Sequence, residues 1–221
     1  MFSAAIFDMD GLLIDSERAI MGLWERATTE LGRPLSQAEF IGVIGRAASE
    51  SAAVLTATLG PAVFARASER VRNAIMSADP AKLFPLKPGS RELLIRLRDR
   101  GIRCAVASST VSDEVRRRLS AVGLLDHFDS VVGGDLVARG KPDPALYRLA
   151  VDALGIESVA CLAFEDSDNG VAAAAAAGVR VILVPDLKTP SDTSVARSLE
   201  VLPSLSEALS RLDSWFPTAS R

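Results

Sequence analysis

The chain has 221 residues, of which 48% are hydrophobic and 24% charged, with a formal net charge of −3. This length fits one domain, or one domain with a modest insertion, and the hydrophobic share can form a core without cross-links. The mixed, slightly acidic charge excludes the basic patch that binds nucleic acids or anionic membranes, and no apolar run approaches the roughly 20 residues of a membrane span. The N-terminus lacks a secretory signal pattern, so we expect a cytoplasmic protein, and we expect a monomer.

The first predicted element is a strand over Ser3–Phe7, an apolar run that suits burial on both faces of a sheet. Helical patterns follow and cover Glu17–Leu31, Ser36–Ile44, Ala47–Leu59 and Pro61–Ala78. Prolines then mark the return to alternating elements. We therefore predict an all-helical domain, residues 16–83, inserted into a core made of residues 1–15 and 84–221.

Beyond this insertion, short apolar runs alternate with helical patterns. The predicted strands are Ile102–Ala107, Ser130–Val132, Val159–Phe164 and Val179–Val184, and the predicted helices are Gly89–Arg100, Val111–Val122, Pro142–Leu154 and Asn169–Ala177. This alternation predicts an α/β fold with a doubly wound, parallel, Rossmann-like sheet, whose ligand site lies at the carboxyl ends of the strands. Cys104 and Cys161 fall within two of the strands, so we expect buried, reduced cysteines.

Two acidic segments follow different predicted strands. Asp8 and Asp10 come directly after the first strand and precede Gly11, while Glu165 and Asp166 follow the strand that ends at residue 164. Either segment alone has a simpler explanation, namely a strand-ending turn or helix capping. Four carboxylates at one edge of a sheet, however, repel one another unless a cation offsets their charge, and Mg²⁺ prefers carboxylate oxygens. The two segments together predict a Mg²⁺ site.

Two further segments offer groups that suit a phosphate. The strand ending at residue 107 runs into Ser108, Ser109 and Thr110, which supply hydroxyls and backbone N–H groups just before a helix. Helix capping accounts for one of these residues but does not require three. Lys141 precedes Pro142 at the predicted start of a helix, where a cation is unfavourable unless carboxylates or a phosphate lie beside it.

Taken in order, these segments resemble the four motifs of the haloacid dehalogenase-like superfamily. The motifs are Asp8-Met9-Asp10-Gly11-Leu12-Leu13-Ile14-Asp15-Ser16-Glu17, the strand end at Ser108, Lys141-Pro142, and Glu165-Asp166-Ser167 with Gly170. More narrowly, the chain is similar to the branch that contains β-phosphoglucomutase and sugar-phosphate phosphatases. The predicted helical insertion is similar to the cap domain of that branch.

The resemblance implies a phosphoric monoester hydrolase that forms an aspartyl-phosphate on Asp8, with Asp10 as general acid and base. In this reading Ser108 and the N–H of Ser109 bind the phosphoryl oxygens, and Lys141 neutralises charge on the nucleophile and the phosphoryl group.

The resemblance also implies Mg²⁺ as the cofactor. Its ligands would be the Asp8 side chain, the Asp10 main-chain carbonyl and Asp166. Glu165 would be a further ligand or would hold a metal-bound water.

The insertion decides between a phosphatase and a mutase. Gly45-Arg46 resembles a mutase motif that holds the second phosphate of the substrate, to which a forked guanidinium is well suited, and Trp24 matches a tryptophan common in mutase-like members. A solvent-exposed arginine and a tryptophan that only packs are the alternatives. Mutases also carry a histidine and a lysine where this chain has Ile20 and Met76. We therefore expect a phosphatase of small phosphate monoesters of sugars or sugar alcohols, with a β-phosphoglucomutase-type mutase as the alternative.

Other functions fit the sequence less well. A relative that had kept the fold without catalysis would have lost a motif acid, and all of them are present here. A phosphonate hydrolase would use a lysine of the insertion to form a Schiff base, and residues 16–83 contain only Lys82, at their very end. Arg116, Arg117 and Arg118 lie on a predicted helix whose other face is apolar, and we expect all three to face solvent.

Overall fold

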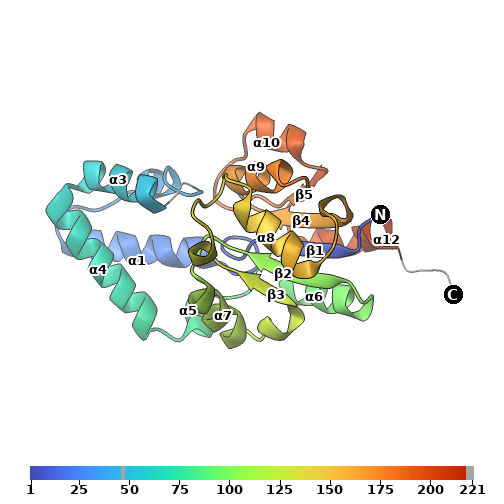
Figure 1. Ribbon diagram of the computed structural model, residues 1–221. Coiled ribbons are helices and arrows are strands. Elements are labelled where there is room, and N and C mark those ends of the chain that lie inside the picture. Colours follow the sequence, from blue (N-terminus) through green and yellow to red (C-terminus); the bar gives the residue numbers. More distant parts are fainter. Residues whose placement is uncertain (46–47, 218–221) are drawn as a thin grey trace.

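A computed structural model of the protein describes residues 1–45 and 48–217. Its strands form one six-stranded parallel sheet in the order β3-β2-β1-β4-β5-β6 (Figure 1). The strands are β1 (Ala4–Phe7), β2 (Arg103–Ala107), β3 (Ser130–Val132), β4 (Cys161–Glu165), β5 (Arg180–Leu183) and β6 (Glu200–Val201). The chain builds the sheet outward from β1 in one direction and then, from β4, in the other. The predicted doubly wound α/β fold is therefore confirmed.

Helices connect the strands and cover both faces of the sheet. They are α1 (Ser16–Glu30), α2 (Gln37–Ile41), α3 (Ala48–Leu59), α4 (Pro61–Ser77), α5 (Pro80–Leu83), α6 (Ser90–Asp99), α7 (Ser112–Ala121), α8 (Ala145–Leu154), α9 (Asp168–Ala176), α10 (Asp192–Arg197), α11 (Leu205–Ala208) and α12 (Leu212–Trp215). Among the residues described, the helices are too short or too polar to cross a membrane.

Side chains of β1 alternate between two hydrophobic clusters, one on each face of the sheet. Ala5 and Phe7 belong to the cluster made with α6, α7, α11 and α12, whereas Ala4 and Ile6 belong to the cluster made with α8 and α9. Successive side chains of a strand point to opposite faces, so a strand with helices on both sides needs an unbroken apolar run. This requirement explains why the sequence identified the central strands.

The segment between β1 and β2 contains α1 to α5. Helix α1 packs along α4, and Trp24 of α1 stacks on Phe64 of α4 with ring centroids 5.8 Å apart. Figure 1 shows α1, α3 and α4 grouped at one end of the molecule, beyond the carboxyl ends of the strands. These helices enclose their own small apolar clusters, which include Phe40 and Leu55 in one and Ala67 and Val71 in the other.

Several elements differ from the sequence-based expectation, and α10, α11 and α12 near the C-terminus were not predicted. Helix α8 begins at Ala145 and not at Pro142, because Pro144 disfavours helical geometry at the residue before it, and the Asp143 carboxylate accepts a hydrogen bond from the Ala145 N–H (3.0 Å). Strand β6 was not predicted, since its two residues at the edge of the sheet are too few to show a pattern. Cys104 and Cys161 are buried and free, as expected.

Candidate active site

Neighbouring strands bring the sequence-predicted residues to one edge of the sheet. Asp8 follows β1, Ser108 follows β2, and Asp166 follows β4, and β1 pairs with both of the other strands. All three side chains are buried, as is Lys141, and they line one cavity of about 250 Å³. The parallel arrangement therefore places the acidic and the hydroxyl-rich strand ends side by side, as predicted.

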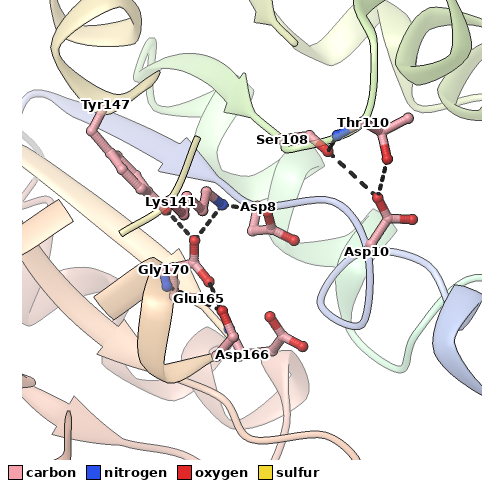
Figure 2. Close-up of polar contacts among 10 residues, drawn as sticks. Asp8, Asp10, Ser108, Thr110, Lys141, Tyr147, Glu165, Asp166 and Gly170 are labelled. Carbon is pink, nitrogen blue, oxygen red and sulfur yellow. Dashed lines mark hydrogen bonds and ion pairs between the residues drawn. The ribbon is translucent and has the colours of Figure 1, made fainter. Parts of the chain in front are cut away.

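Lys141 connects two carboxylates at this edge. Its Nζ lies 2.5 Å from Oδ1 of Asp8 and 2.5 Å from Oε1 of Glu165, and the Tyr147 hydroxyl donates to the same Glu165 oxygen over 2.6 Å (Figure 2). Burial alone would lower the pKa of Lys141, but the charges of Asp8 and Glu165 raise it above its usual value. Lys141 is therefore a permanent cation beside Asp8. It lies in the loop before α8, at a cis peptide bond with Pro142, and not at a helix N-terminus as predicted.

The carboxyl groups of Asp8 and Asp166 lie in surroundings that disfavour their charged forms. Burial raises the pKa of Asp8 to about 8, although the charge of Lys141 opposes the shift. Burial and the charge of Asp8 raise the pKa of Asp166 well above its usual range. A divalent cation beside the two carboxylates would favour ionisation of both. Gly11 also keeps the space beside Asp166 open, since a Cβ there would lie 2.3 Å from Oδ2 of Asp166. Asp8 and Asp166 therefore fit a bound cation.

The Asp10 side chain points toward the end of β2. Its Oδ2 accepts a hydrogen bond from the Thr110 hydroxyl (2.8 Å) and lies 3.4 Å from the Ser108 hydroxyl, as Figure 2 shows. Its Oδ1 is 2.9 Å from Nη1 of Arg118. Asp10 is thus oriented by α7 and the β2–α7 loop, and it borders the same cavity as Asp8.

Comparison with known proteins identifies this arrangement. A family model for haloacid dehalogenase-like hydrolases matches residues 2–178. The chain belongs to the haloacid dehalogenase-like hydrolases. The expected family, fold class and type of enzyme, a phosphoric monoester hydrolase, are confirmed.

Relatives within this family are similar over most of their length. A phosphorylated carbohydrates phosphatase of Thermotoga maritima is 32% identical over 183 residues, which cover 81% of this chain and 83% of the relative. Hexitol phosphatase B of Escherichia coli O157:H7 is 32% identical over 212 residues, covering 92% and 93%. The crystal structure of CbbY from Rhodobacter sphaeroides in complex with phosphate is 29% identical, with a TM-score of 0.74 over 94% of this chain and 96% of that one.

The Glu165 side chain is held by four hydrogen-bond donors. Its Oε1 binds Lys141 and Tyr147, and its Oε2 accepts hydrogen bonds from the Asp166 N–H (3.2 Å) and the Ser167 hydroxyl (3.3 Å). Both oxygens of this fully buried residue thus have donors, and Glu165 holds Lys141. The role of Glu165 as a metal ligand, or as the holder of a metal-bound water, stays a prediction. Within the described ranges, no three acidic, histidine or cysteine side chains form a ready-made metal cluster. Two carboxylates and a main-chain carbonyl remain compatible with this result.

Residues predicted in the helical insertion have different surroundings. Gly45 borders the cavity, and its carbonyl oxygen accepts a hydrogen bond from Asn169 at the start of α9. Ile20 lines the same cavity, whereas Trp24 lines an apolar cavity within the insertion. Arg46 lies outside the described residues. Ser109 borders the active-site cavity and is exposed, so its N–H remains a predicted phosphate donor.

Arg118 lines the active-site cavity, which the sequence did not reveal, as it did not reveal the contact of Tyr147 with Glu165. We expected Arg118 to face solvent with Arg116 and Arg117, but its side chain is only 8% exposed and reaches Asp10. Glu114, one helical turn earlier, binds its Nε over 2.7 Å. The spacing of an acid and a base four residues apart was visible in the sequence, but such pairs are common on exposed helix faces. That α7 lies against the active site follows only from the packing of the helices.

Proposed function

We propose that the protein is a Mg²⁺-dependent phosphatase of small phosphate monoesters that transfers the phosphoryl group to Asp8. The observation that carries this proposal is the position of Asp8. It is bound to the permanent cation Lys141 and lies between the hydroxyl-rich end of β2 and the acidic end of β4. Phosphoryl transfer needs mainly positioning and charge stabilisation, which such a site supplies.

Two steps follow from the residues present. In the first, a carboxylate oxygen of Asp8 attacks phosphorus, the bond from phosphorus to the ester oxygen breaks, and Asp10 gives a proton to the leaving oxygen. Because Lys141 binds Oδ1 of Asp8, we assign the attack to Oδ2. In the second step, water attacks phosphorus and passes a proton to Asp10, and the bond from phosphorus to Asp8 breaks.

The remaining groups hold the transferring phosphoryl group. Ser108 and the N–H of Ser109 would donate hydrogen bonds to its oxygens, and Lys141 would offset its negative charge. Mg²⁺, held by Asp8, Asp166 and the main-chain carbonyl of Asp10, would supply further neutralisation of the charge that develops on these oxygens.

The proposed substrates are phosphates of sugars or sugar alcohols. The relatives named for phosphorylated carbohydrates and for hexitols support this class, since the chain covers more than four-fifths of each. Apolar Ile20 in the active-site cavity favours hydrolysis over a mutase reaction, because a mutase must retain a second charged phosphate with polar groups there.

The test is phosphate release from a panel of hexose, hexitol and nucleotide monophosphates, with and without Mg²⁺, with β-glucose 1-phosphate in the panel and product isomers monitored. Mg²⁺-dependent release from one or a few carbohydrate esters is expected, and Asp8→Asn serves as the inactive control. Formation of an isomeric sugar phosphate with little free phosphate would replace the phosphatase proposal by the mutase. Release that survives in Asp8→Asn would refute the covalent mechanism.

A further inference from the structure

Arg118 bridges two carboxylates inside the protein. Its Nη1 lies 2.9 Å from Oδ1 of Asp10 and its Nε lies 2.7 Å from Oε1 of Glu114, so the guanidinium uses two different edges. Its Cζ lies 4.3 Å from the centre of the Phe84 ring, which is fully buried where the helical insertion rejoins the core. A buried guanidinium with contacts at two edges and one face has little freedom to move.

Glu114 is itself held in place from the opposite side. Arg117 binds it with two parallel hydrogen bonds, from Nε to Oε2 over 2.6 Å and from Nη2 to Oε1 over 2.7 Å. Arg117 is one-third exposed, and Arg118 is almost fully buried. The chain of contacts therefore runs from the surface of α7 through Glu114 and Arg118 to Asp10.

Asp10 depends on this chain for its orientation. Its side chain is 21% exposed and lies in a loop after β1, where a short carboxylate has several accessible rotamers. Arg118 holds Oδ1 while Thr110 holds Oδ2, so the plane of the carboxylate is determined by two donors from separate positions. Both donors belong to the core.

We infer that Arg118 is a positioning residue that orients Asp10 for proton transfer to and from the reacting groups; the inference rests on the proposed function, in which Asp10 is the general acid and base. The orientation that Arg118 imposes places the Asp10 carboxyl group to face the leaving oxygen in the first step. In the second step the same orientation places Asp10 to accept a proton from the attacking water. No further reactant is needed, because the proton that Asp10 loses in the first step is regained in the second.

The experiment compares two substrates that differ in their need for an acid. The first is an alkyl phosphate, namely the best carbohydrate ester from the panel. Its leaving group would depart as a strongly basic alkoxide and therefore needs a proton from the acid. The second is 4-nitrophenyl phosphate, whose leaving group, 4-nitrophenolate, is a stable anion and does not need the proton. For both, kcat/KM reports on the steps up to breakage of the ester bond. In Arg118→Met, which keeps an apolar stem over Phe84, we expect kcat/KM for the alkyl ester to fall about 10- to 100-fold and that for the aryl ester to change less than about threefold.

Matched variants separate positioning from folding. Arg116→Met removes an exposed arginine of the same helix that takes no part in this chain of contacts, and it should leave the activity on both substrates unchanged. Arg118→Lys keeps the charge and should recover part of the alkyl activity. Circular dichroism and thermal unfolding show whether Arg118→Met folds. If it does not, Arg118→Lys alone is compared with the wild type, and its kcat/KM should still fall more for the alkyl ester than for the aryl ester.

A double variant that combines Arg118→Met with Asp10→Asn tests whether Arg118 acts through Asp10. Without the acid there is nothing for Arg118 to orient, so the double variant should match Asp10→Asn on the alkyl ester. Suppose that Asp10→Asn loses activity on the alkyl ester selectively. The inference would then be overturned if the Arg118 variants lost activity equally on both substrates, kept their activity on the alkyl ester, or gained activity. If Asp10→Asn itself retains alkyl activity, the proposed function fails first, and the two failures are distinguishable.

Discussion

Gly170 in the first turn of α9 stands where one added methyl group would strike a residue of the active site. A Cβ built on Gly170 would lie 1.9 Å from Cδ and from Oε2 of Glu165. Figure 2 shows Gly170 directly beside that carboxylate. Glu165 is fully buried and cannot swing into solvent. Gly170→Ala must therefore displace the carboxylate from Lys141 and Tyr147, the donors to its Oε1.

The magnitude follows from these two contacts. A hydrogen bond that involves a charged group contributes about 1.5–3 kcal/mol, so loss of both costs about 3–6 kcal/mol. Alanine in place of glycine within a helix returns about 0.5–1 kcal/mol. We expect a net loss of about 2–5 kcal/mol in the free energy of unfolding, a large part of the roughly 5–15 kcal/mol typical of a whole protein.

Urea unfolding followed by circular dichroism measures this change, and α1 offers a matched control. Gly22 is exposed in the middle of that helix, and a Cβ built on it meets nothing within 4 Å. Gly22→Ala should therefore stabilise the protein by about 0.5–1 kcal/mol. If Gly170→Ala were as stable as the wild type, the claim that Glu165 is held rigidly against Lys141 would be wrong.

Three further outcomes are expected. Asp8→Asn keeps the shape of the nucleophile but not its charge, so phosphate release should fall by orders of magnitude while circular dichroism stays unchanged; turnover near that of the wild type would contradict the covalent step. Chelation with EDTA should stop hydrolysis and added Mg²⁺ should restore it, which the same phosphate assay reports, and full activity in EDTA would argue against a cation site. Because the pKa of Asp8 is raised from 3.8 to about 8, the folded protein retains a proton that the unfolded chain loses. In EDTA, the Asp8 contribution to stability is thus fully present below about pH 4 and is lost as pH rises to about 8, at up to about 1.4 kcal/mol per pH unit. Asp166, whose pKa is also raised, contributes a slope of the same sign in both proteins, so urea unfolding over this range should show a steeper slope in the wild type than in Asp8→Asn, and equal slopes would refute the Asp8 contribution.

The sequence was sufficient for the order of the elements up to β5 and for the strand ends at which the candidate site lies. Central strands such as β1 and β4 are covered by helices on both faces, so each needs a continuous apolar run that stands out in the sequence. Asp8 and Asp166 follow two of these runs directly, and parallel strands bring their carboxyl ends to the same edge. The edge that these residues reach is thus determined by the direction of the strands and by the short distance in sequence between each strand and its acidic residue.

Tertiary packing alone decided which partner each of these side chains has. The Glu165 carboxylate contacts Lys141 and Tyr147, because α8 packs against β2 and β3 and carries Tyr147 into the core. Arg118 reads as a solvated helix residue until α7 is placed beside Asp10, where the guanidinium is buried. A side chain's contacts depend on elements that are far away in the sequence. The hydrophobic pattern of a helix shows which face is buried but does not show the angle at which the helix packs on a sheet. The sequence by itself determined where the reactive groups emerge from the sheet, and the packing of the helices determined what holds them.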